Sequence, residues 1–479
     1  MARSSAWLSL SLSFLVLFNG CFGRQSFQQE SQNNECQLSH IKALNPAFDI
    51  PAEGGKTEFW DISDEQFKCG GASAFRHTIE PQGLLLPSYT NAPLVAYVLE
   101  GSGQFGIVYP GCAETYQSSS QQSKQSEKHQ KIENYRQGDI LVFLEGTAHW
   151  VYNSGKDQTV LVVLQDTSNY VNQLDDYPLR FFLAGDTPSS HPPQREQGRR
   201  QQGQREQGQQ QHGGQQEETD SPFGYSNNIL AGFDAQIIKD ALNTDMETAK
   251  KIVGEDSTEQ RGHIILVKEP LQLIAPSRSG ERRQSGGRHG GGSSNALEET
   301  LCTARVLQNI ESSENADIYD DQAGHFTTLN SFTLPIFSLV RLSAARGVLN
   351  TNWGIVPRWS MNAHSFVYVT KGSAKVQIVN QQGKLVLDQN VKEKQLFLVP
   401  QNFAVVKQAG DEGFEWVEFN TNENAMYNTF SGRTSTLAGL PAGIIAASYE
   451  LSNSEAEKLK LNMVNTWFYQ ASNKGSRFM

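Results

Sequence analysis

The sequence predicts an all-β protein that contains two β-barrel or jelly-roll domains, each followed by a helical arm. Three observations support this fold class: short β-rich runs, an internal repeat, and helix-start signals near the end of each half. A chain of 479 residues is too long for one ordinary domain and suits two domains with linkers.

The β-rich runs are separated by Gly, Asn and Asp, which are typical of turns. Short strands at such spacing favour a closed barrel or a jelly roll over a parallel sheet. The expected strands include residues 94–108, 139–143 and 159–164 in the first half, and residues 366–379 and 395–399 in the second.

The internal repeat places the same features in the same order in both halves. Residues 98–103 match residues 369–374, and residues 143–146 match residues 398–401. Further along each half, residues 231–238 match residues 438–445. The chain is therefore a duplication, and each half is expected to form one barrel.

Helix signals follow each barrel. Thr244 with Glu247, and Ser452 with Glu455, have the spacing of a capping box, in which two side chains satisfy free amides at a helix start. Apolar residues follow both signals. These arms have no obvious apolar partner in their own barrel, which suggests that they are buried against a neighbouring subunit.

Residues 1–23 have the features of a signal peptide: Arg3, an apolar run over residues 7–18, and small residues before a plausible cut. A membrane anchor is the weaker alternative, because a spanning helix needs roughly 20 apolar residues. Removal of this segment also removes Cys21 and leaves Cys36, Cys69, Cys112 and Cys302. Two disulfides are expected in an oxidising compartment, three pairings are open, and buried free thiols are the alternative.

Three polar segments lack the apolar residues needed to form a core, and we expect them to be mobile loops: residues 117–130, 192–220 and 276–295. In residues 194–216, 11 of 23 positions are Gln, which indicates a solvated insertion; an adhesive interaction tract is the alternative. A net charge of -11 and no visible basic face argue against nucleic-acid binding. The chain also has no Gly-x-Ser-x-Gly elbow, phosphate loop or His-Glu-x-x-His motif.

Two segments carry a family resemblance. Residues 138–153 are similar to the second cupin motif, with Gly138, Gly146, His149 and Asn153 at the expected spacing and Leu144 where the family usually has Pro. Residues 295–302 resemble the processing site of legumin-type (11S) seed storage globulins, with Ala296 in place of the usual Gly. The resemblance extends over the whole mature chain, so the two barrels are expected to be cupin domains.

The resemblance implies specific roles for six residues. Cys36 and Cys69 match a disulfide within the first cupin, and Cys112 and Cys302 match the bond between the two processed chains. An asparaginyl endopeptidase is expected to cut between Asn295 and Ala296. The expected parts are the first cupin domain at 24–275 with its Gln-rich insertion at 192–220, a linker at 276–295, and the second cupin domain at 296–479.

Enzymatic cupins hold a transition metal with three His and a carboxylate. In this chain those positions fall on Pro87, Tyr89, Leu94 and His149 in the first barrel, and on Arg358, Ser360, Ser365 and Val405 in the second. One His cannot hold a metal against water, so His149 is interpreted as a hydrogen-bonded residue at the barrel mouth. We therefore expect no metal, no cofactor and no catalytic residue.

Composition and resemblance together predict a seed storage protein, a nutrient reservoir that is not an enzyme. The 42 Gln and 30 Asn residues each carry a second nitrogen that hydrolysis releases. The resemblance implies self-assembly into trimers and then hexamers, delivery through the secretory pathway to protein storage vacuoles, and allergenicity. Two alternatives remain: a metal-dependent cupin enzyme, or a cupin that binds a small ligand such as a sugar or hormone at a barrel mouth.

Overall fold

The computed structural model describes residues 36, 38–114, 116–118, 127–174, 177–185, 228–255, 261–271, 273, 301–462 and 467–471. The expected signal peptide, the Gln-rich insertion, the linker, Asn295 and Ala296 lie outside these residues. Within the described part, no helix is both long and apolar enough to cross a membrane.

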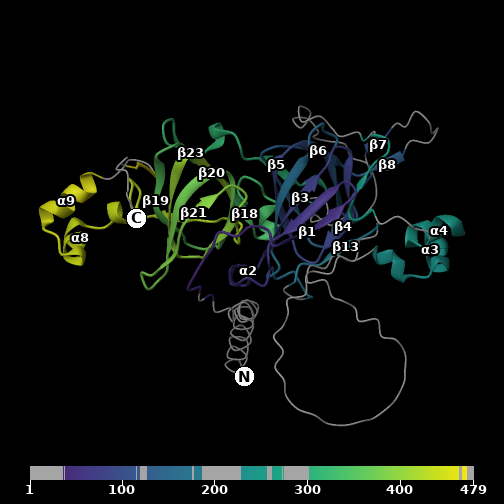
Figure 1. The fold of residues 1–479 in the computed structure, drawn as a ribbon, viewed down its shortest axis with the longest axis horizontal. Helices are drawn as coiled ribbons and strands as arrows, with labels where there is room; N and C mark the ends of the chain where they lie inside the picture. The colour runs from purple at the N-terminus through teal and green to yellow at the C-terminus, as the bar shows by residue number, and fades with distance from the viewer. Residues whose placement is uncertain are drawn as a thin grey trace, which may run out of the picture.

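Two β-barrels lie side by side, with one helical arm at each end of the molecule (Figure 1). The first barrel has one sheet in the order β1-β2-β3-β12-β5-β10-β15 and a second in the order β13-β4-β11-β6-β9, with β14 paired to β4. The strands are β1 Phe48–Ala52, β2 Gly55–Phe59, β3 Ser73–Ile79, β4 Gly83–Thr90, β5 Leu94–Glu100, β6 Ser102–Val108, β9 Ile132–Arg136, β10 Asp139–Phe143, β11 Ala148–Tyr152, β12 Thr159–Gln165, β13 Arg180–Phe182, β14 Ile264–Leu266 and β15 Leu307–Asn309.

The second barrel repeats this plan as one connected set of strands. Its order is β16-β17-β18-β23-β19-β24, with β20 paired to β21, β22 and β23, and β25 paired to β19. The strands are β16 Ile318–Asp320, β17 Gly324–Leu329, β18 Ser343–Leu349, β19 Trp353–Ser360, β20 Ser365–Val379, β21 Leu385–Lys392, β22 Leu396–Val399, β23 Ala404–Asn420, β24 Tyr427–Thr429 and β25 Phe468–Gln470. The predicted all-β fold with two barrels is confirmed.

The repeated glycine of each half marks a sharp bend in the chain, between two sheets in the first barrel and within one long strand in the second. Gly101 has a φ of 86° and separates β5 from β6, while Gly372 has a φ of 73° inside the long strand β20. A Cβ at Gly101 would lie 2.5 Å from the Gln158 carbonyl oxygen, and one at Gly372 would lie 2.2 Å from the Gly413 carbonyl oxygen. Both the backbone angle and the close approach therefore require glycine.

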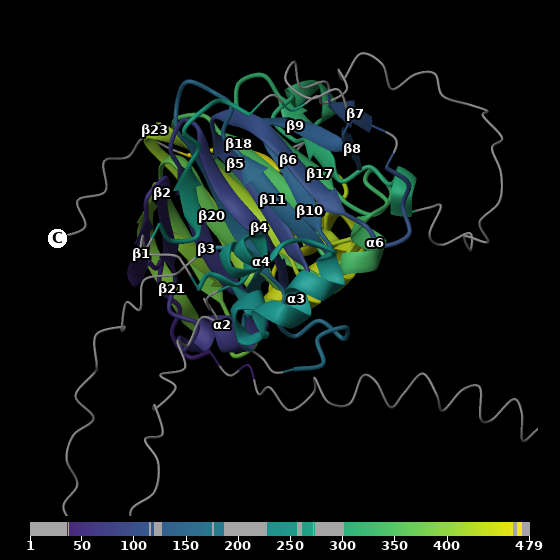
Figure 2. The same cartoon turned by 90° about the vertical axis from the view of Figure 1, so that its right-hand side faces the viewer.

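Each arm consists of three short helices with a small core of its own. The first arm has η2 Ile229–Gly232, α3 Ala235–Leu242 and α4 Met246–Val253, and the second has α7 Thr436–Gly439, α8 Ala442–Tyr449 and α9 Asn453–Leu461. Figure 2 views the molecule from the end that carries α3 and α4. The arm cores are Ala235, Ile238, Ala249 and Val253 in the first, and Leu437, Ile445, Ala446 and Ala456 in the second. The prediction of two arms is confirmed.

One of the two predicted capping boxes is correct. In α9 the Ser452 hydroxyl accepts from the Glu455 amide at 3.2 Å, and the Glu455 carboxylate accepts from the Ser452 amide at 2.8 Å. The prediction of Thr244 as the cap of α4 is wrong by one residue, since the cap is Asp245. The Asp245 carboxylate accepts from the amide and the hydroxyl of Thr248, whereas the Thr244 amide is used to close α3 by donating to Lys239.

The expected loop at residues 117–130 contains regular structure in its described parts. Strand β7 Tyr116–Ser118 pairs with β8 Glu127–His129 in an antiparallel hairpin. The Gln130 side chain accepts from the Tyr109 amide and donates to the carbonyl oxygens of Tyr109 and Cys112. These bonds fix the base of the hairpin to the end of β6; the prediction of a mobile loop at residues 117–130 did not include this hairpin.

The two halves of the chain exchange backbone pairing. Near the N-terminus, Leu44 and Leu396 bond each other in both directions at 2.8 and 2.9 Å, so an early segment joins the second barrel. In return, β15 pairs with β10 of the first barrel. Between the barrels, Tyr368 accepts from Arg76 at 3.0 Å and packs edge-on against Trp60. One continuous apolar core runs through both barrels.

Candidate functional site

The metal-ligand positions of the first barrel do not form a metal site. Pro87 and Leu94 have no side-chain donor atom, and Tyr89 on β4 stacks on Phe181 with 4.9 Å between ring centroids. His149 on β11 is 2 % exposed, its ring lies 4.6 Å from that of Phe143, and its Nδ1 lies 3.0 Å from the backbone oxygen of Thr147. Burial lowers the pKa of His149 to about 3, so the ring is neutral.

Two further histidines are buried in the same barrel. The Thr57 hydroxyl lies 2.7 Å from Nδ1 of His77 and 2.6 Å from Nε2 of His263, so it can donate to one ring and accept from the other. Burial is the main cause that lowers the pKa of His77 well below its usual value and that of His263 to about 3. The Arg180 guanidinium lowers both pKa values further. The rings therefore serve as neutral core residues.

The ligand positions of the second barrel also carry other interactions. Val405 has no donor atom, the Ser360 hydroxyl accepts from the Ala363 amide at 3.2 Å, and the Ser365 hydroxyl donates to Asn420 at 2.6 Å. Arg358, on β19, occupies the remaining ligand position and is 1 % exposed. Its guanidinium lies 4.3 Å from the centroid of Phe326 and 4.6 Å from that of Tyr427. A cation at a ligand position excludes a second cation by repulsion.

A buried carboxylate compensates this arginine. Glu418 on β23 accepts from Arg358 Nη2 at 2.6 Å, from Lys407 Nζ, and from Trp416 Nε1 at 2.7 Å. Tyr427 donates to its second oxygen at 3.0 Å. Although burial alone would raise it, the two cations and these bonds hold the pKa of Glu418 at about 2. Burial lowers the pKa of Lys407 to about 8, and Glu418 opposes that effect.

At the positions where cupin enzymes hold a metal, the barrel interiors thus contain a neutral imidazole, an ion-paired arginine, hydroxyl groups and apolar side chains, and these residues do not fit one. The motif search located His149 and Arg358 but missed His77, His263, Lys407 and Glu418. Lys407 could have been found, because it lies two residues from Val405 and two from Ala409. Residues at this spacing point to the same face of a strand, which here is the buried face of β23.

The structure contains two disulfides. Cys36 is bonded to Cys69, and Cys112 to Cys302, which is the pairing that the resemblance implies. Cys69 lies in α2 Glu65–Gly70, which begins at the Asp64 cap. Burial also lowers the pKa of His364, which lies beside the first of these disulfides.

The comparisons with known proteins agree with this fold. The sequence model of the Cupin family matches residues 41–188 and 308–457. "11S globulin seed storage protein 1" of Carya illinoinensis is 42% identical over 98% of this chain and 97% of its own length. "Legumin A" of Gossypium hirsutum is 43% identical over 98% of each chain.

Solved structures give the same assignment. Procruciferin, an 11S globulin from Brassica napus, superposes with a TM-score of 0.76 at 38% identity, over 92% of this chain and 99% of its own. Pumpkin seed globulin superposes with a TM-score of 0.76 at 37% identity, over 91% and 99%. The chain therefore belongs to the cupin family and, within it, to the 11S, legumin-type seed storage globulins.

Proposed function

We propose that the protein is a nitrogen and amino-acid reservoir, delivered through the secretory pathway to protein storage vacuoles of seeds after removal of residues 1–23. The observation that carries this proposal is the filling of both barrel interiors, where Arg358, Glu418 and the neutral His149 replace a metal site. The amide-rich composition, with 42 Gln and 30 Asn, supports it. We propose no catalytic residue and no cofactor.

The storage proposal is tested by following the protein through seed development and germination with quantitative immunoblots. A reservoir must become a major fraction of seed protein and then disappear as the seedling grows. A low and constant amount in seeds and leaves would be incompatible with storage and would favour the ligand-binding alternative.

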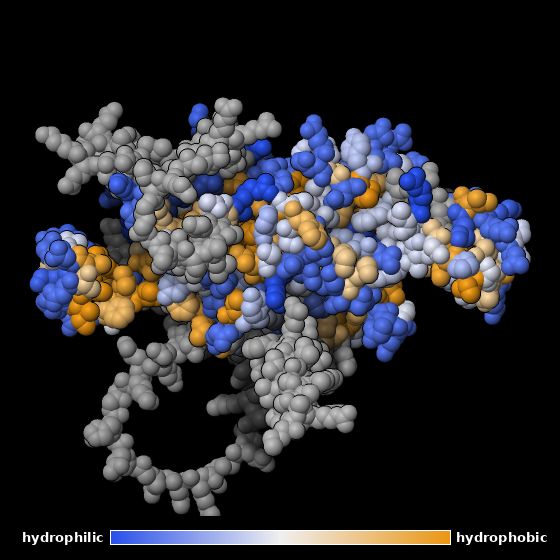
Figure 3. Space-filling model, turned by 180° about the vertical axis from the view of Figure 1, so that it is seen from behind, coloured by the Kyte–Doolittle hydropathy of each residue, from blue (hydrophilic) through white to orange (hydrophobic). Residues whose placement is uncertain are grey.

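We propose that the arms join subunits head to tail into a closed trimer. Both arms expose apolar side chains beyond their small cores, as the hydrophobic patches at the two ends of the molecule show (Figure 3). Phe233, Ile237 and Leu242 in the first arm are 54%, 59% and 55% exposed, and Ile444 and Leu461 in the second are 52% and 83% exposed. Contacts between two different surfaces of one subunit close into a ring when the rotation fits, and they bury this apolar area.

We propose that cutting after Asn295 allows two trimers to form a hexamer. An uncut linker is tied at both ends and would cover a trimer face, whereas a cut linker can move aside. Asn295→Gln should therefore sediment as a trimer at protein and salt concentrations where the processed protein sediments as a hexamer. Ser294→Ala is the matched control and should be cut and assemble normally. Hexamers of uncut Asn295→Gln would show that cutting does not control assembly.

Processing would leave two chains that are held by more than a disulfide. Because β15 pairs with β10 and Leu44 with Leu396, reduction of Cys112–Cys302 should not separate the chains under native conditions. We expect one gel-filtration peak with or without reductant, but two bands on a denaturing gel only with reductant. Separation of the chains by reductant alone, without denaturant, would contradict this prediction.

A further inference from the structure

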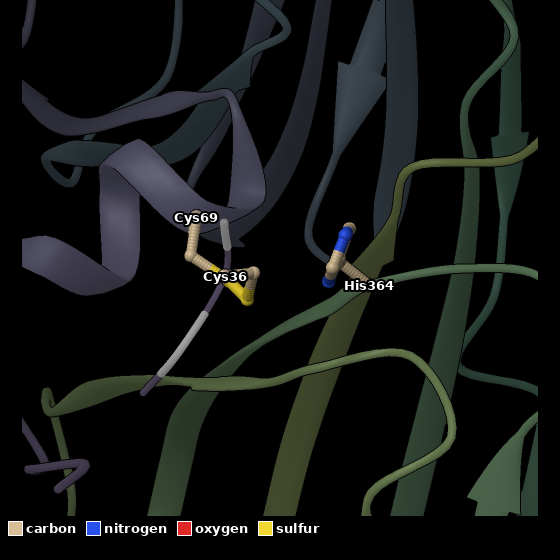
Figure 4. Close-up of side chains that lie close together, drawn as sticks. All are labelled: Cys36, Cys69 and His364. Atoms are coloured by element: carbon tan, nitrogen blue, oxygen red, sulfur yellow. A yellow bond between two sulfur atoms is a disulfide. The ribbon is translucent and has the colours of Figure 1, made fainter. Parts of the chain in front are cut away.

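The disulfide Cys36–Cys69 lies next to the imidazole of His364 (Figure 4). One ligand atom from each residue lies within 4.8 Å of the other two, and all three residues are only partly buried. Among the residues that the structure describes, this is the one group of three or more His, Cys, Asp or Glu side chains that close together. The residues come from both halves of the chain, because His364 lies between β19 and β20 of the second barrel.

Contacts independent of the disulfide hold His364 and the helix of Cys69 in place. The backbone of His364 bonds Thr421 in both directions: its amide donates to the Thr421 hydroxyl and its carbonyl oxygen accepts from the Thr421 amide, each at 3.0 Å. Helix α2, which carries Cys69, is fixed to the second barrel by the stacking of Phe67 on Phe366, with 5.6 Å between ring centroids. The Cys69 sulfur is thus expected to stay near His364 when the Sγ–Sγ bond is broken.

We propose that reduction of the Cys36–Cys69 disulfide creates a zinc site formed by the two thiolates and His364. A dithiol reductant supplies two electrons and two protons: the Sγ–Sγ bond breaks, two cysteine thiols form, and the reductant closes its own disulfide. Zn²⁺ then displaces the two thiol protons and bonds both sulfurs and one ring nitrogen. Water takes the fourth position, which partial exposure of the three residues permits.

The donor set decides which class of cation fits. Thiolate and imidazole select Zn²⁺ and other soft or borderline cations, and they exclude Mg²⁺ and Ca²⁺, which take oxygen ligands. With zinc bonds of about 2.3 Å to sulfur and about 2.0 Å to nitrogen, the two sulfurs must move apart after reduction to span the metal, and the His364 ring must move toward them. The oxidised disulfide has no thiolate to offer, so the redox state controls binding.

One existing contact must yield to the metal. The backbone amide of Gln401 donates to Nδ1 of His364 over 3.2 Å, so the neutral ring carries its proton on Nε2. Zinc binding at Nδ1 replaces this long bond, and binding at Nε2 requires the proton to move to Nδ1. In either case the Gln401 amide is released, and because Gln401 is exposed, water can satisfy it.

The second disulfide provides an internal control. Cys112 and Cys302 are also joined, but within the described part of the chain they belong to no group of three metal-ligand side chains. Wild-type protein that has been reduced and then freed of the dithiol should bind one equivalent of Co²⁺, with thiolate-to-cobalt charge-transfer absorption, and Zn²⁺ should displace it. Zn²⁺ should slow alkylation of Cys36 and Cys69 but not of Cys112 and Cys302, as peptide mass spectrometry measures.

The variant test compares two histidines. His364→Gln should weaken Co²⁺ binding at least tenfold in the reduced protein, while His325→Gln on β17 should leave it unchanged; melting temperatures establish that both variants fold. Equal Co²⁺ affinity in His364→Gln, equal zinc protection of all four cysteines, or one tight equivalent of Co²⁺ on the oxidised protein would each overturn the proposal. None of these results would affect the storage proposal, which does not depend on a metal.

Discussion

Glu418→Gln is expected to lower the free energy of unfolding by about 3–5 kcal/mol, the range measured when one partner of a buried ion pair is removed. Glu418 and Arg358 are each 1 % exposed, and Lys407 is equally buried. Without the carboxylate, Arg358 and Lys407 both lose the buried counter-charge that they contact. The melting temperature at fixed pH and protein concentration measures the loss.

A surface pair supplies the control for this prediction. Asp388 pairs with Lys375, and both side chains are at least 40% exposed, so Asp388→Asn should change stability by about 0–1 kcal/mol. Adding Lys407→Met to Glu418→Gln should restore part of the lost stability, because it removes one uncompensated cation. Equal melting temperatures for Glu418→Gln and the wild type would show that the buried triad does not stabilise the second barrel.

The pH dependence of stability provides a second test of the buried triad, because the pKa of Lys407 differs between the folded and unfolded states. Its folded pKa of about 8 lies below the ordinary value of 10.5, so between these pH values the unfolded chain binds more protons. Stability from this group therefore rises as pH increases through that window. In Lys407→Met this rise should be absent, as melting curves between pH 8 and 10 would measure.

How far the sequence predicts this fold depends on the range of the interactions concerned. Short β-rich runs and the turn residues between them are local, and they predicted strands such as β10 at its observed bounds. The cap of α4 failed because Thr244 and Asp245 are adjacent and only the structure shows which one faces the helix. The exchange of Leu44 and β15 between barrels leaves no local signal, since either segment reads as a short strand of its own half.

The same reasoning applies to the polar groups inside the barrels. Motif spacing located His149 and Arg358, because both lie a short, fixed number of residues from a motif glycine. His77 and His263 share Thr57 across 20 and 206 residues, so their association depends on the closed barrel. The position of His364 beside Cys36 and Cys69 depends in turn on how the two barrels pack.

Acid should destabilise the first barrel strongly, through the three buried histidines. His77, His149 and His263 all have depressed folded pKa values, at about 3 for the last two. An unfolded histidine binds its proton near pH 6.5, so between pH 6.5 and 3 the unfolded chain binds more protons and stability falls as pH falls. Each such histidine contributes about 1.4 kcal/mol per pH unit inside this window.

One buried carboxyl opposes this effect. Burial raises the pKa of Asp166 to about 7, so between pH 7 and its ordinary value of 3.8 the folded protein binds more protons, and acid stabilises it there. His149 and His263 against Asp166 leave a net loss of about 1.4 kcal/mol per pH unit between pH 6.5 and 4, and His77 acts in the same direction as the other two histidines. Below pH 4.5 Glu418, with a folded pKa of about 2, adds to the loss.

A single variant isolates the histidine contribution. His149→Gln keeps a polar side chain of similar size but cannot be protonated, so its melting temperature should fall less steeply between pH 6.5 and 4 than that of the wild type. His40→Gln, which removes an exposed histidine, is the control. The change in the free energy of unfolding per pH unit should be smaller in His149→Gln than in the wild type by about 1.4 kcal/mol, which corresponds to one proton. Identical slopes for His149→Gln and His40→Gln would show that His149 is not held neutral by its burial, and that other groups cause the acid sensitivity.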